Sequence, residues 1–529
     1  MSKPRVAVFA GPYATIANSP PLVTSNKGRG PADKKLSGRF DHLVPQRLYE
    51  PVTVRISRFS AHPMEGEAAG VHHDDGLPYH EVELVPEDGL YLLPYVARRE
   101  DGSPLGRPFE TEDLDDPAQH YGGRQFFFPD ASRMFEEIDR SISGRDVSGW
   151  GNALDQRANF DFFRPLPSAG FPSQGEQWGI DFFPYQPFAL SRGRPRREDL
   201  VRVSGAVDRA LATGDYAGAL WLECSSTIEE TLYWLSLTVN NDLPIAGCAA
   251  QRPHGQVSND GDRNIIDAVD YLVSGAGQGL GAVGIQDERI FAARDFKKGD
   301  DRPGGYKATG GHGGVLGTVG PPVTLWYRPV YRHTTESAVV LEQLAQTVAF
   351  QEYANAPDEE RIRIKDESGA LLPQAVPRVT MLKYGAFMDE SEVLDPDLEV
   401  GIMARVTRSV EEQANRVGSH FQGFILEGDS PYAMGSGEQT AAIEVAAFSG
   451  MPVVRVARAD PGGLVPRMWS DHTVLGSNLD ANKARILLMA AMLKLGRLPK
   501  ARDARHPTVA EREAVARKVS DFQTIFDTH

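Results

Sequence analysis

Cysteine is nearly absent from this chain of 529 residues, which contains only Cys224 and Cys248. Two cysteines, each beside an apolar stretch, form no disulfide framework, and this usage is typical of a reducing compartment. Long apolar runs are also missing, because no stretch approaches the ~20 residues of a membrane-spanning helix. The apolar run at residues 5–10 is too short for a secretory signal. We therefore expect a cytoplasmic protein with no membrane partner.

Positive charge is in deficit, with 56 Lys and Arg against 72 Asp and Glu and a formal net charge of -16. Phosphate binding needs clustered basic residues, so this balance argues against a nucleic-acid partner or an anionic membrane surface. The charge is better explained by solubility. The hydrophobic share of 41% allows large cores, and the length suits at least two domains of about 150 residues each.

The most informative stretch of the sequence lies at residues 221–267. An apolar run at 217–222 has the length and character of a strand buried on both faces, and it stops at the small residues 224–226. Thr227 with Glu230 three places later predicts a capping box, and apolar residues then recur at helical spacing. The serines of 224–226 are therefore predicted at a strand-to-helix turn, where parallel α/β sheets bind ligands.

Four short motifs follow one another in this region: Cys-Ser-Ser-Thr at 224–227, Glu-Glu-Thr at 229–231, Ala-Ala-Gln-Arg-Pro at 249–253 and Ser-Asn-Asp-Gly-Asp-Arg-Asn at 258–264. Their order and spacing resemble the asparaginase and glutaminase amidohydrolases of the bacterial two-domain type. That family has Gly-Thr-Asp-Thr, Glu-Glu-Thr, Gly-Ala-x-Arg-Pro and Ser-x-Asp-Gly-x-x-Asn. One position departs from the family, because Ser226 stands where the family turn has its acidic residue.

The resemblance implies a nucleophile near the N-terminus. Residues 5–10 predict a buried strand, and Gly11-Pro12 and then Thr15-Ile16-Ala17 follow it. The family begins with a strand, a glycine-containing turn and Thr-Ile-Ala, whose threonine is the nucleophile. Thr15 is the matching residue, although an isolated threonine in a loop is otherwise usually a turn residue.

The resemblance also implies a catalytic lysine. The family has Asp-x-x-Ile, then Ala-Arg, then a strand that ends in Thr-Lys-Thr, and counting from Arg294 places Lys298 on that lysine rather than Lys297. Ser225 keeps the hydroxyl of the family's second cluster. Ser191 is the nearest match to the family's substrate-contacting serine, and backbone N–H groups near Thr15 and Ala250 would be the oxyanion donors.

Ser226 changes the chemistry that the family would predict. A hydroxyl needs a base to attack an amide, and a lysine held neutral by burial can supply one. The family's carboxylate would pair with that lysine and with a substrate ammonium. Its replacement by Ser226 should lower the lysine pKa and weaken binding of a zwitterionic amino acid.

Other reactive residue types have simpler explanations. The His and acidic runs at 72–75 and 80–81 match no established metal spacing, and such runs are commonly solvated. Cys224 has no obvious histidine base nearby and stands at the family's glycine, so a packed thiol is the preferred interpretation. No metal or other cofactor is expected.

The rest of the chain suggests how the domains are arranged. Residues 1–332 are expected to form a larger N-terminal α/β domain with an insertion at about 19–197, which is rich in aromatics. A connecting segment at 333–377 leads to a smaller α/β domain at 378–529, where 477–488 resembles the family's Gly-x-Leu-x-x-x-Lys-Ala-Arg-x-Leu-Leu. The resemblance implies mostly parallel sheets, an active site at the domain junction, and a homodimer or homotetramer.

Two functions remain in competition. The first is an asparaginase-like hydrolase of a small amide, imide, lactam or ester that lacks the α-ammonium of asparagine, acting through an acyl-enzyme. The second is a catalytically inactive protein of the same fold that binds a small ligand or serves as a subunit. An amidotransferase subunit acting on aminoacyl-tRNA is disfavoured by the acidic balance. Retention of Thr15, Ser225 and Lys298 favours the enzyme.

Overall fold

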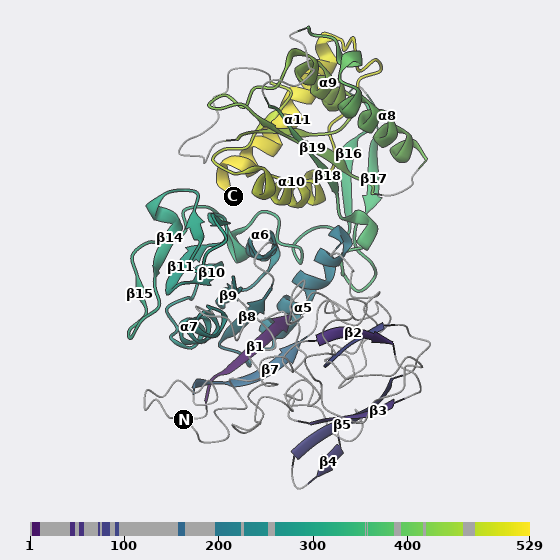
Figure 1. The fold of residues 1–529 in the computed structure, drawn as a ribbon. Helices are drawn as coiled ribbons and strands as arrows, with labels where there is room; N and C mark the ends of the chain where they lie inside the picture. Colours follow the sequence, from purple (N-terminus) through teal and green to yellow (C-terminus); the bar gives the residue numbers. More distant parts are fainter. Residues whose placement is uncertain are drawn as a thin grey trace, which may run out of the picture.

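The computed structural model of this chain describes residues 3–10, 43–47, 52–57, 72–74, 77–84, 90–94, 157–163, 196–223, 227–251, 260–354, 356, 358–385, 393–415, 419–458 and 471–529. These residues form two groups of strands and helices (Figure 1). The lower group is coloured from purple to teal in the figure, and the upper group from green to yellow. The predicted α/β class with mostly parallel sheets is confirmed. The proposed division at 332 and 377 stays a prediction.

The larger sheet contains eight of the described strands, in the order β15-β14-β11-β10-β9-β8-β1-β7. Neighbours from β10 to β7 are parallel, whereas β10, β11, β14 and β15 pair antiparallel. The strands are β1 (Arg5–Ala10), β7 (Asn159–Phe163), β8 (Gly218–Leu222), β9 (Ile245–Cys248), β10 (Ala282–Gln286), β11 (Arg289–Ala292), β14 (Val315–Thr318) and β15 (Thr324–Leu325).

Strand β7 shows that the expected insertion is part of the main sheet. It pairs in parallel with β1, with Arg5 opposite Asn159 and Phe9 opposite Phe163. The aromatic run that contains Phe160 therefore extends the sheet beyond β1. The sequence showed the apolar character of this run but not its partner, because a single strand does not specify the strand beside it.

Helices cover both faces of the larger sheet because successive side chains of each buried strand point to opposite faces. On one face, Val6, Val8 and Leu220 pack with α7 (Gly261–Val273). On the other, Phe9 and Trp221 pack in the core formed with α5 (Leu200–Ala212) and α6 (Ile228–Thr238). The apolar runs at 5–10 and 217–222 are continuous because both faces are buried.

The smaller sheet has four parallel described strands in the order β18-β19-β20-β21. These are β18 (Arg378–Lys383), β19 (Gln422–Gly428), β20 (Val453–Ala457) and β21 (Val474–Leu475). Helices α8 (Val400–Ala414) and α9 (Gly437–Phe448) contribute to the core on one face. Helices α10 (Ala481–Leu495) and α11 (Val509–Thr528) belong to the core on the other.

Helix α10 joins the two sheets. It packs against β18 and β19 on one side and against α6 on the other, and Figure 1 shows it between the upper sheet and α6. One apolar core contains Trp234 of α6, Leu487 of α10 and Phe522 of α11, all buried. The two groups of elements therefore share a core instead of meeting only through polar surfaces.

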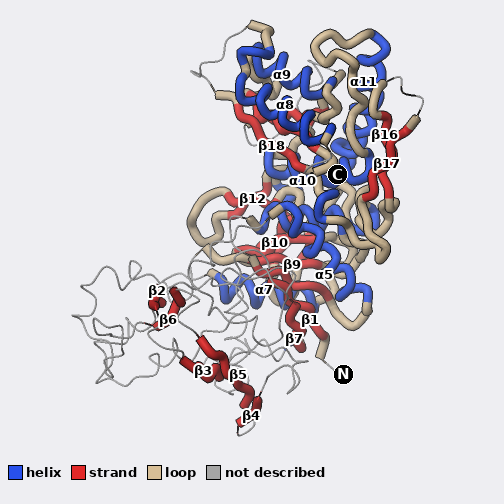
Figure 2. Tube along the Cα trace, turned by 90° about the vertical axis from the view of Figure 1, so that its right-hand side faces the viewer, coloured by secondary structure: helices blue, strands red, loops and turns tan. Residues whose placement is uncertain are grey.

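Shorter elements complete the described chain. The two-stranded sheets pair β12 (Phe296–Lys298) with β13 (Tyr306–Ala308), β16 (Thr347–Gln351) with β17 (Glu359–Arg363), and β2 (Leu43–Arg47) with β6 (Leu90–Pro94). Strands β3 (Val52–Ser57), β5 (Leu77–Leu84) and β4 (His72–Asp74) form a further sheet, to one side of the main sheet in Figure 2. The 3₁₀ helices are η6 (Arg197–Asp199), η7 (His312–Gly314), η8 (Thr334–Glu336), η9 (Pro373–Ala375) and η10 (Pro396–Leu398).

The predicted capping box at the start of α6 is wrong. Thr227 is the N-cap residue of this helix, but its side chain makes no capping hydrogen bond. The carboxylate of Glu230 instead pairs with Arg485 of α10. An ion pair with another helix has replaced the local hydrogen bond, which a sequence pattern cannot anticipate. Among the described residues, no helix combines the length and apolar character needed to cross a membrane.

The shared core predicts that a cavity in α10 destabilises the elements of the larger sheet as well. Leu487 is fully buried, so Leu487→Ala should lower the free energy of unfolding by about 2–5 kcal/mol. Urea unfolding followed by tryptophan fluorescence, to which the buried Trp221 and Trp234 contribute, should detect this loss. Leu394→Ala, at a leucine that is 73% exposed, is the control and should leave the midpoint nearly unchanged. An unchanged tryptophan transition in Leu487→Ala would contradict a shared core.

Candidate active site

Three segments with predicted site residues leave the larger sheet at the same edge. Strand β8 is parallel to both β1 and β9, and its last residue, Leu222, lies opposite Ala10 of β1 and Cys248 of β9. The carboxyl ends of these strands are therefore level. Ligands of open parallel sheets bind in the crevice beyond such ends. The chain continues from them toward Thr15, Ser225 and Ala250, respectively.

The predicted site residues differ in what the structure describes. Thr15, Ser191, Ser225 and Ser226 lie outside the described residues, and so does Cys224. The side chains of the His and acidic runs at 72–75 and 80–81 also lie outside them. Ala250 and Lys298 lie among the described residues. Within the described part of the chain, no group of three or more His, Cys, Asp and Glu residues is placed to hold a metal ion.

The main chain on both sides of Ala250 is fixed by the motif at 258–264. The amide of Asn264 donates to the carbonyl oxygen of Ala249 at 2.8 Å, and Gln286 donates to the same oxygen at 3.0 Å. The carboxylate of Asp260 accepts the Gln251 N–H at 3.0 Å. These contacts give Asp260 and Asn264 a structural role, because they anchor the segment whose N–H groups were predicted as oxyanion donors.

Lys298 lies at the end of β12, with a side chain that is 25% exposed. Its Nζ is 2.8 Å from Oδ1 of Asp301, a residue whose side chain is 91% exposed. The lysine is thus less deeply buried than a base held neutral by its surroundings would be. The neighbouring Lys297 has a different partner, with its Nζ 3.1 Å from Oδ2 of Asp480 at the start of α10.

Glu229 connects Lys298 to the first turn of α6. Its Oε2 accepts the backbone N–H of Lys298 at 2.9 Å, and the Glu229 residue is 7% exposed. Burial raises the pKa of Glu229, and the ammonium of Lys483 opposes that rise. The sequence signal for Glu229 was its place in the Glu-Glu-Thr motif, to which no role had been assigned.

Lys483 of α10 lies in the Lys-Ala-Arg match at 483–485. Like Glu229, it had no role assigned from the sequence. It is 1% exposed, and its ammonium donates to the backbone oxygens of Glu229 and, at 2.6 Å, Ala293. The ring of Tyr233 lies with its centroid 5.4 Å from Nζ. Burial lowers the pKa of Lys483 to about 8, although the carboxylates of Glu229 and Asp480 counteract this.

Glu223 is a buried carboxyl directly before residues 224–226 in the sequence. It is fully buried, and it accepts hydrogen bonds from Nε1 of Trp221 at 2.6 Å and from the hydroxyl of Thr231 at 3.0 Å. Burial raises the pKa of Glu223 to about 7, and hydrogen bonds from its donors only partly offset this effect. The carboxyl is therefore poised to change its protonation near neutral pH. Glu223 belongs to none of the motifs found in the sequence, because it lies between the apolar run at 217–222 and the Cys-Ser-Ser-Thr motif at 224–227.

A cavity of about 240 Å³ lies between the two groups of elements and beside Glu223. Its walls come from α5, α6, α10 and the start of β18. The lining residues include Arg197, Leu200, Glu223, Thr231, Arg378 and Arg485. A larger cavity of about 790 Å³ is lined by β17 and by residues near the end of α8. Neither Ala250 nor Lys298 lines either cavity, but the smaller one is lined by Glu223 and Thr227, which flank residues 224–226 in the sequence. We take the smaller cavity as the one that adjoins the candidate site.

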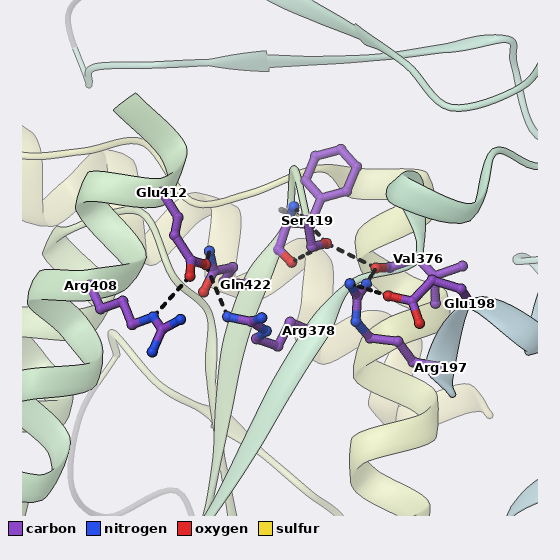
Figure 3. A network of polar contacts seen from close by, with 9 residues as sticks. Arg197, Glu198, Val376, Arg378, Arg408, Glu412, Ser419 and Gln422 are labelled. Carbon is purple, nitrogen blue, oxygen red and sulfur yellow. Dashed lines mark hydrogen bonds and ion pairs between the residues drawn. The ribbon is translucent and has the colours of Figure 1, made fainter. Parts of the chain in front are cut away.

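A polar network fixes the wall of the smaller cavity (Figure 3). Arg197 donates to the backbone oxygen of Val376, and the hydroxyl of Ser419 donates to the same oxygen at 2.8 Å. Arg378 pairs with Glu412 of α8 at 2.9 Å. The network thus ties the segment before α5 to the first residues of the smaller sheet, and it keeps the cavity between them in a defined shape.

Comparisons with known proteins agree on one family. Residues 194–302 match the family model described as Asparaginase, N-terminal. L-asparaginase 2 of Bacillus subtilis (strain 168) is 24% identical over 298 residues, which are 56% of this chain and 66% of that protein. L-asparaginase 2-3 of Saccharomyces cerevisiae is 31% identical over 167 residues, which are 30% of this chain and 46% of that protein. The matched stretches span less than two-thirds of these relatives.

Among solved structures, a probable cytoplasmic L-asparaginase from Campylobacter jejuni aligns with 71% of this chain and 93% of its own. Its sequence identity is 17% and its TM-score is 0.48. A likeness at this level carries no argument about function. The family assignment depends on the sequence comparisons.

The raised pKa of Glu223 predicts a stability that falls as pH rises. Because the folded state binds this proton more tightly, the contribution of the neutral carboxyl is full below pH 4.5 and is lost as pH rises to about 7. A shift of this size corresponds to about 3 kcal/mol. Glu223→Gln, which stays neutral, should remove this loss in urea unfolding at pH 5 and pH 8. Glu367→Gln, at an exposed carboxyl, is the control. An unchanged pH dependence in Glu223→Gln would show that Glu223 is ionised when folded.

Proposed function

The chain belongs to the asparaginase/glutaminase family, and we propose that it is an amidohydrolase that cleaves a small amide, imide, lactam or ester. The names of the relatives supply the reaction class, hydrolysis of a carbon–nitrogen bond. The proposed reaction passes through an acyl-enzyme on Thr15. No cofactor takes part in this scheme.

The observation that carries the proposal is the register of β1, β8 and β9. Ala10, Leu222 and Cys248 lie level at the edge of the sheet, so the segments that continue toward Thr15, Ser225 and Ala250 start from neighbouring positions. The Glu229 contact brings the main chain of Lys298 to the first turn of α6, the helix that follows Ser225 and Ser226 in the sequence. This arrangement supports a site that takes its residues from four segments.

In the proposed reaction, the hydroxyl of Thr15 attacks the substrate carbonyl carbon. The amine of Lys298 accepts the hydroxyl proton, and the leaving nitrogen receives a proton as the carbon–nitrogen bond breaks. Water then hydrolyses the ester on Thr15 and releases the acid. Ser225 would carry the proton between Thr15 and Lys298. N–H groups near Ala250 would stabilise the oxyanion. Lys298 must leave its ion pair with Asp301 before it can act as a base.

The substrate proposal depends on Ser226. A carboxylate at this position would bind the α-ammonium of asparagine, and a serine hydroxyl carries no charge to do so. Ser191 would be a further substrate contact. We therefore propose a substrate without an α-ammonium.

A catalytically inactive ligand-binding or subunit protein is the alternative. The ion pair of Lys298 with Asp301, together with the missing acid at Ser226, is the observation that favours it. An ammonia- and acid-release screen over an amide library separates the two, because the alternative gives no turnover. Covalent labelling of Thr15 by an electrophilic lactone would support the enzyme.

The proposed assembly is a homodimer or homotetramer in the cytoplasm. The net charge of -16 keeps such a protein soluble and gives it no general affinity for nucleic acid. Light scattering at micromolar concentration would contradict the assembly if it returned the 57.9 kDa of a single chain.

The nucleophile and base assignments predict large losses of turnover. Thr15→Ala and Lys298→Met should each lower kcat by several orders of magnitude on the substrate found in the screen. The double variant should be little worse than either, because the two groups act as a unit. Steady-state kinetics measure all three, with Lys383→Met as the control, at a lysine that is 73% exposed and ion-paired with Glu427. Near-normal turnover of Thr15→Ala would exclude Thr15 as the nucleophile.

The substrate assignment predicts opposite effects of one substitution on two substrates. Ser226→Asp should slow the native reaction, because a carboxylate beside Lys298 would hold that amine protonated. The same variant should raise a trace hydrolysis of asparagine by giving its ammonium a partner. Ser226→Asn is the neutral control of similar size. Efficient hydrolysis of asparagine by the unmodified protein would refute the role given to Ser226.

A further inference from the structure

Helix α10 and its N-cap residue make three polar ties to α6 and to the chain at 293–297. Asp480 pairs with Lys297 at 3.1 Å, Lys483 donates to the backbone oxygens of Glu229 and Ala293, and Arg485 pairs with Glu230. These ties join the start of α10 to α6, to the chain between β11 and β12, and to β12 itself. They recur along the first turns of α10.

The Lys483 tie bridges two segments with one charged group. Glu229 is in the first turn of α6, and Ala293 lies between β11 and β12. Without the Lys483 ammonium, the backbone oxygens of Glu229 and Ala293 would both lose this donor. Because the ammonium of Lys483 donates to both oxygens, it fixes the distance between the start of α6 and the strand that ends at Lys298.

The Glu229 side chain adds a second link across the same gap. Its carboxylate accepts the N–H of Lys298 itself at 2.9 Å, while its backbone oxygen accepts from Lys483. Glu229 thus contacts both residues, and the chain of contacts runs from Lys483 through Glu229 to Lys298. Both Glu229 and Lys483 are more than nine-tenths buried.

A purely structural role does not explain an ammonium at this position. Placing a charge in a core is costly, and an apolar residue of similar volume often serves stability equally well or better. The flanking residues Leu487 and Ala484 of the same helix are apolar and fully buried. The feature that an apolar side chain could not reproduce is the pair of bonds to Glu229 and Ala293.

We propose that Lys483 and Glu229 are positioning residues that hold Lys298 at a fixed distance from the first turn of α6, so that the C-terminal helix α10 sets the geometry of the active site. The inference depends on the proposed function for its kinetic consequence. Its structural part, the restraint on Lys298, does not. Neither residue is proposed to touch the substrate.

The structural part is tested at the Lys298 amide by hydrogen exchange and mass spectrometry on a peptide that covers β12. Glu229→Leu removes the acceptor at nearly constant volume, and Glu229→Gln keeps an acceptor oxygen. Exchange at Lys298 should accelerate about tenfold or more in Glu229→Leu and stay near the original rate in Glu229→Gln. Equal exchange in Glu229→Leu and the unmodified protein overturns the inference.

The kinetic part is tested with Lys483→Met, which keeps the volume and removes the charge. We expect kcat to fall about 100-fold with KM within about threefold, as for a displacement of about 1 Å at a reacting group. Lys494→Met is the matched control, because Lys494 is an exposed lysine of the same helix that also donates to a backbone oxygen, that of Ala338. A loss of kcat in Lys483→Met no larger than in Lys494→Met overturns the inference.

Two readouts separate this inference from the proposed function. If the unmodified protein hydrolyses no amide in the screen, the proposed function fails, and the exchange rates at Lys298 alone decide whether Glu229 restrains it. If Lys298→Met keeps full activity while Lys483→Met loses it, Lys298 is not the group being positioned and the inference is overturned. Should Lys483→Met fail to fold, the Glu229→Leu and Glu229→Gln pair still gives both exchange and kcat.

Discussion

Parallel pairing of β8 with β1 and β9 is the constraint on which the candidate site depends. A parallel register brings the carboxyl ends of strands that are far apart in sequence to one edge, and here Ala10, Leu222 and Cys248 end level. The three strands therefore end at neighbouring positions, whatever residues follow them. Burial of both faces fixes that register, since a shift by one residue would turn Phe9 and Trp221 to the opposite core.

The second constraint is the contact of α10 with α6. An apolar core that contains Trp234 and Leu487 makes the two groups of elements cooperative, and the buried Lys483 adds directional bonds to that contact. Apolar packing alone tolerates small shifts between helices, whereas hydrogen bonds to two backbone oxygens do not. The combination explains how a C-terminal helix can define the position of Lys298 without contributing to the proposed chemistry.

Much of this architecture could be predicted from the sequence, because its buried strands are short apolar runs that end at small or polar residues. The strands at 5–10 and 217–222 and the helix after 227 were found in this way. Pairing between distant segments could not be predicted, and the place of β7 beside β1 and the Glu230–Arg485 ion pair belong to that class. Motifs in the sequence identified Lys298 and the Lys-Ala-Arg segment. The hydrogen bond from Lys483 to the backbone oxygen of Glu229 is seen only in the structure. Thr15, Ser191, Ser225 and Ser226 stay predictions.

The charges of the described residues near the candidate site bear on the proposed substrate. Glu223 is a fully buried carboxyl directly before residues 224–226 in the sequence, and burial raises its pKa to about 7, so it is a poor permanent partner for a substrate ammonium. Glu229 is committed to Lys298 and Lys483, and Glu230 to Arg485. The described carboxylates that flank residues 224–226 are therefore neutral in part or already engaged. A substrate without an α-ammonium needs no such partner, which agrees with the serine at position 226.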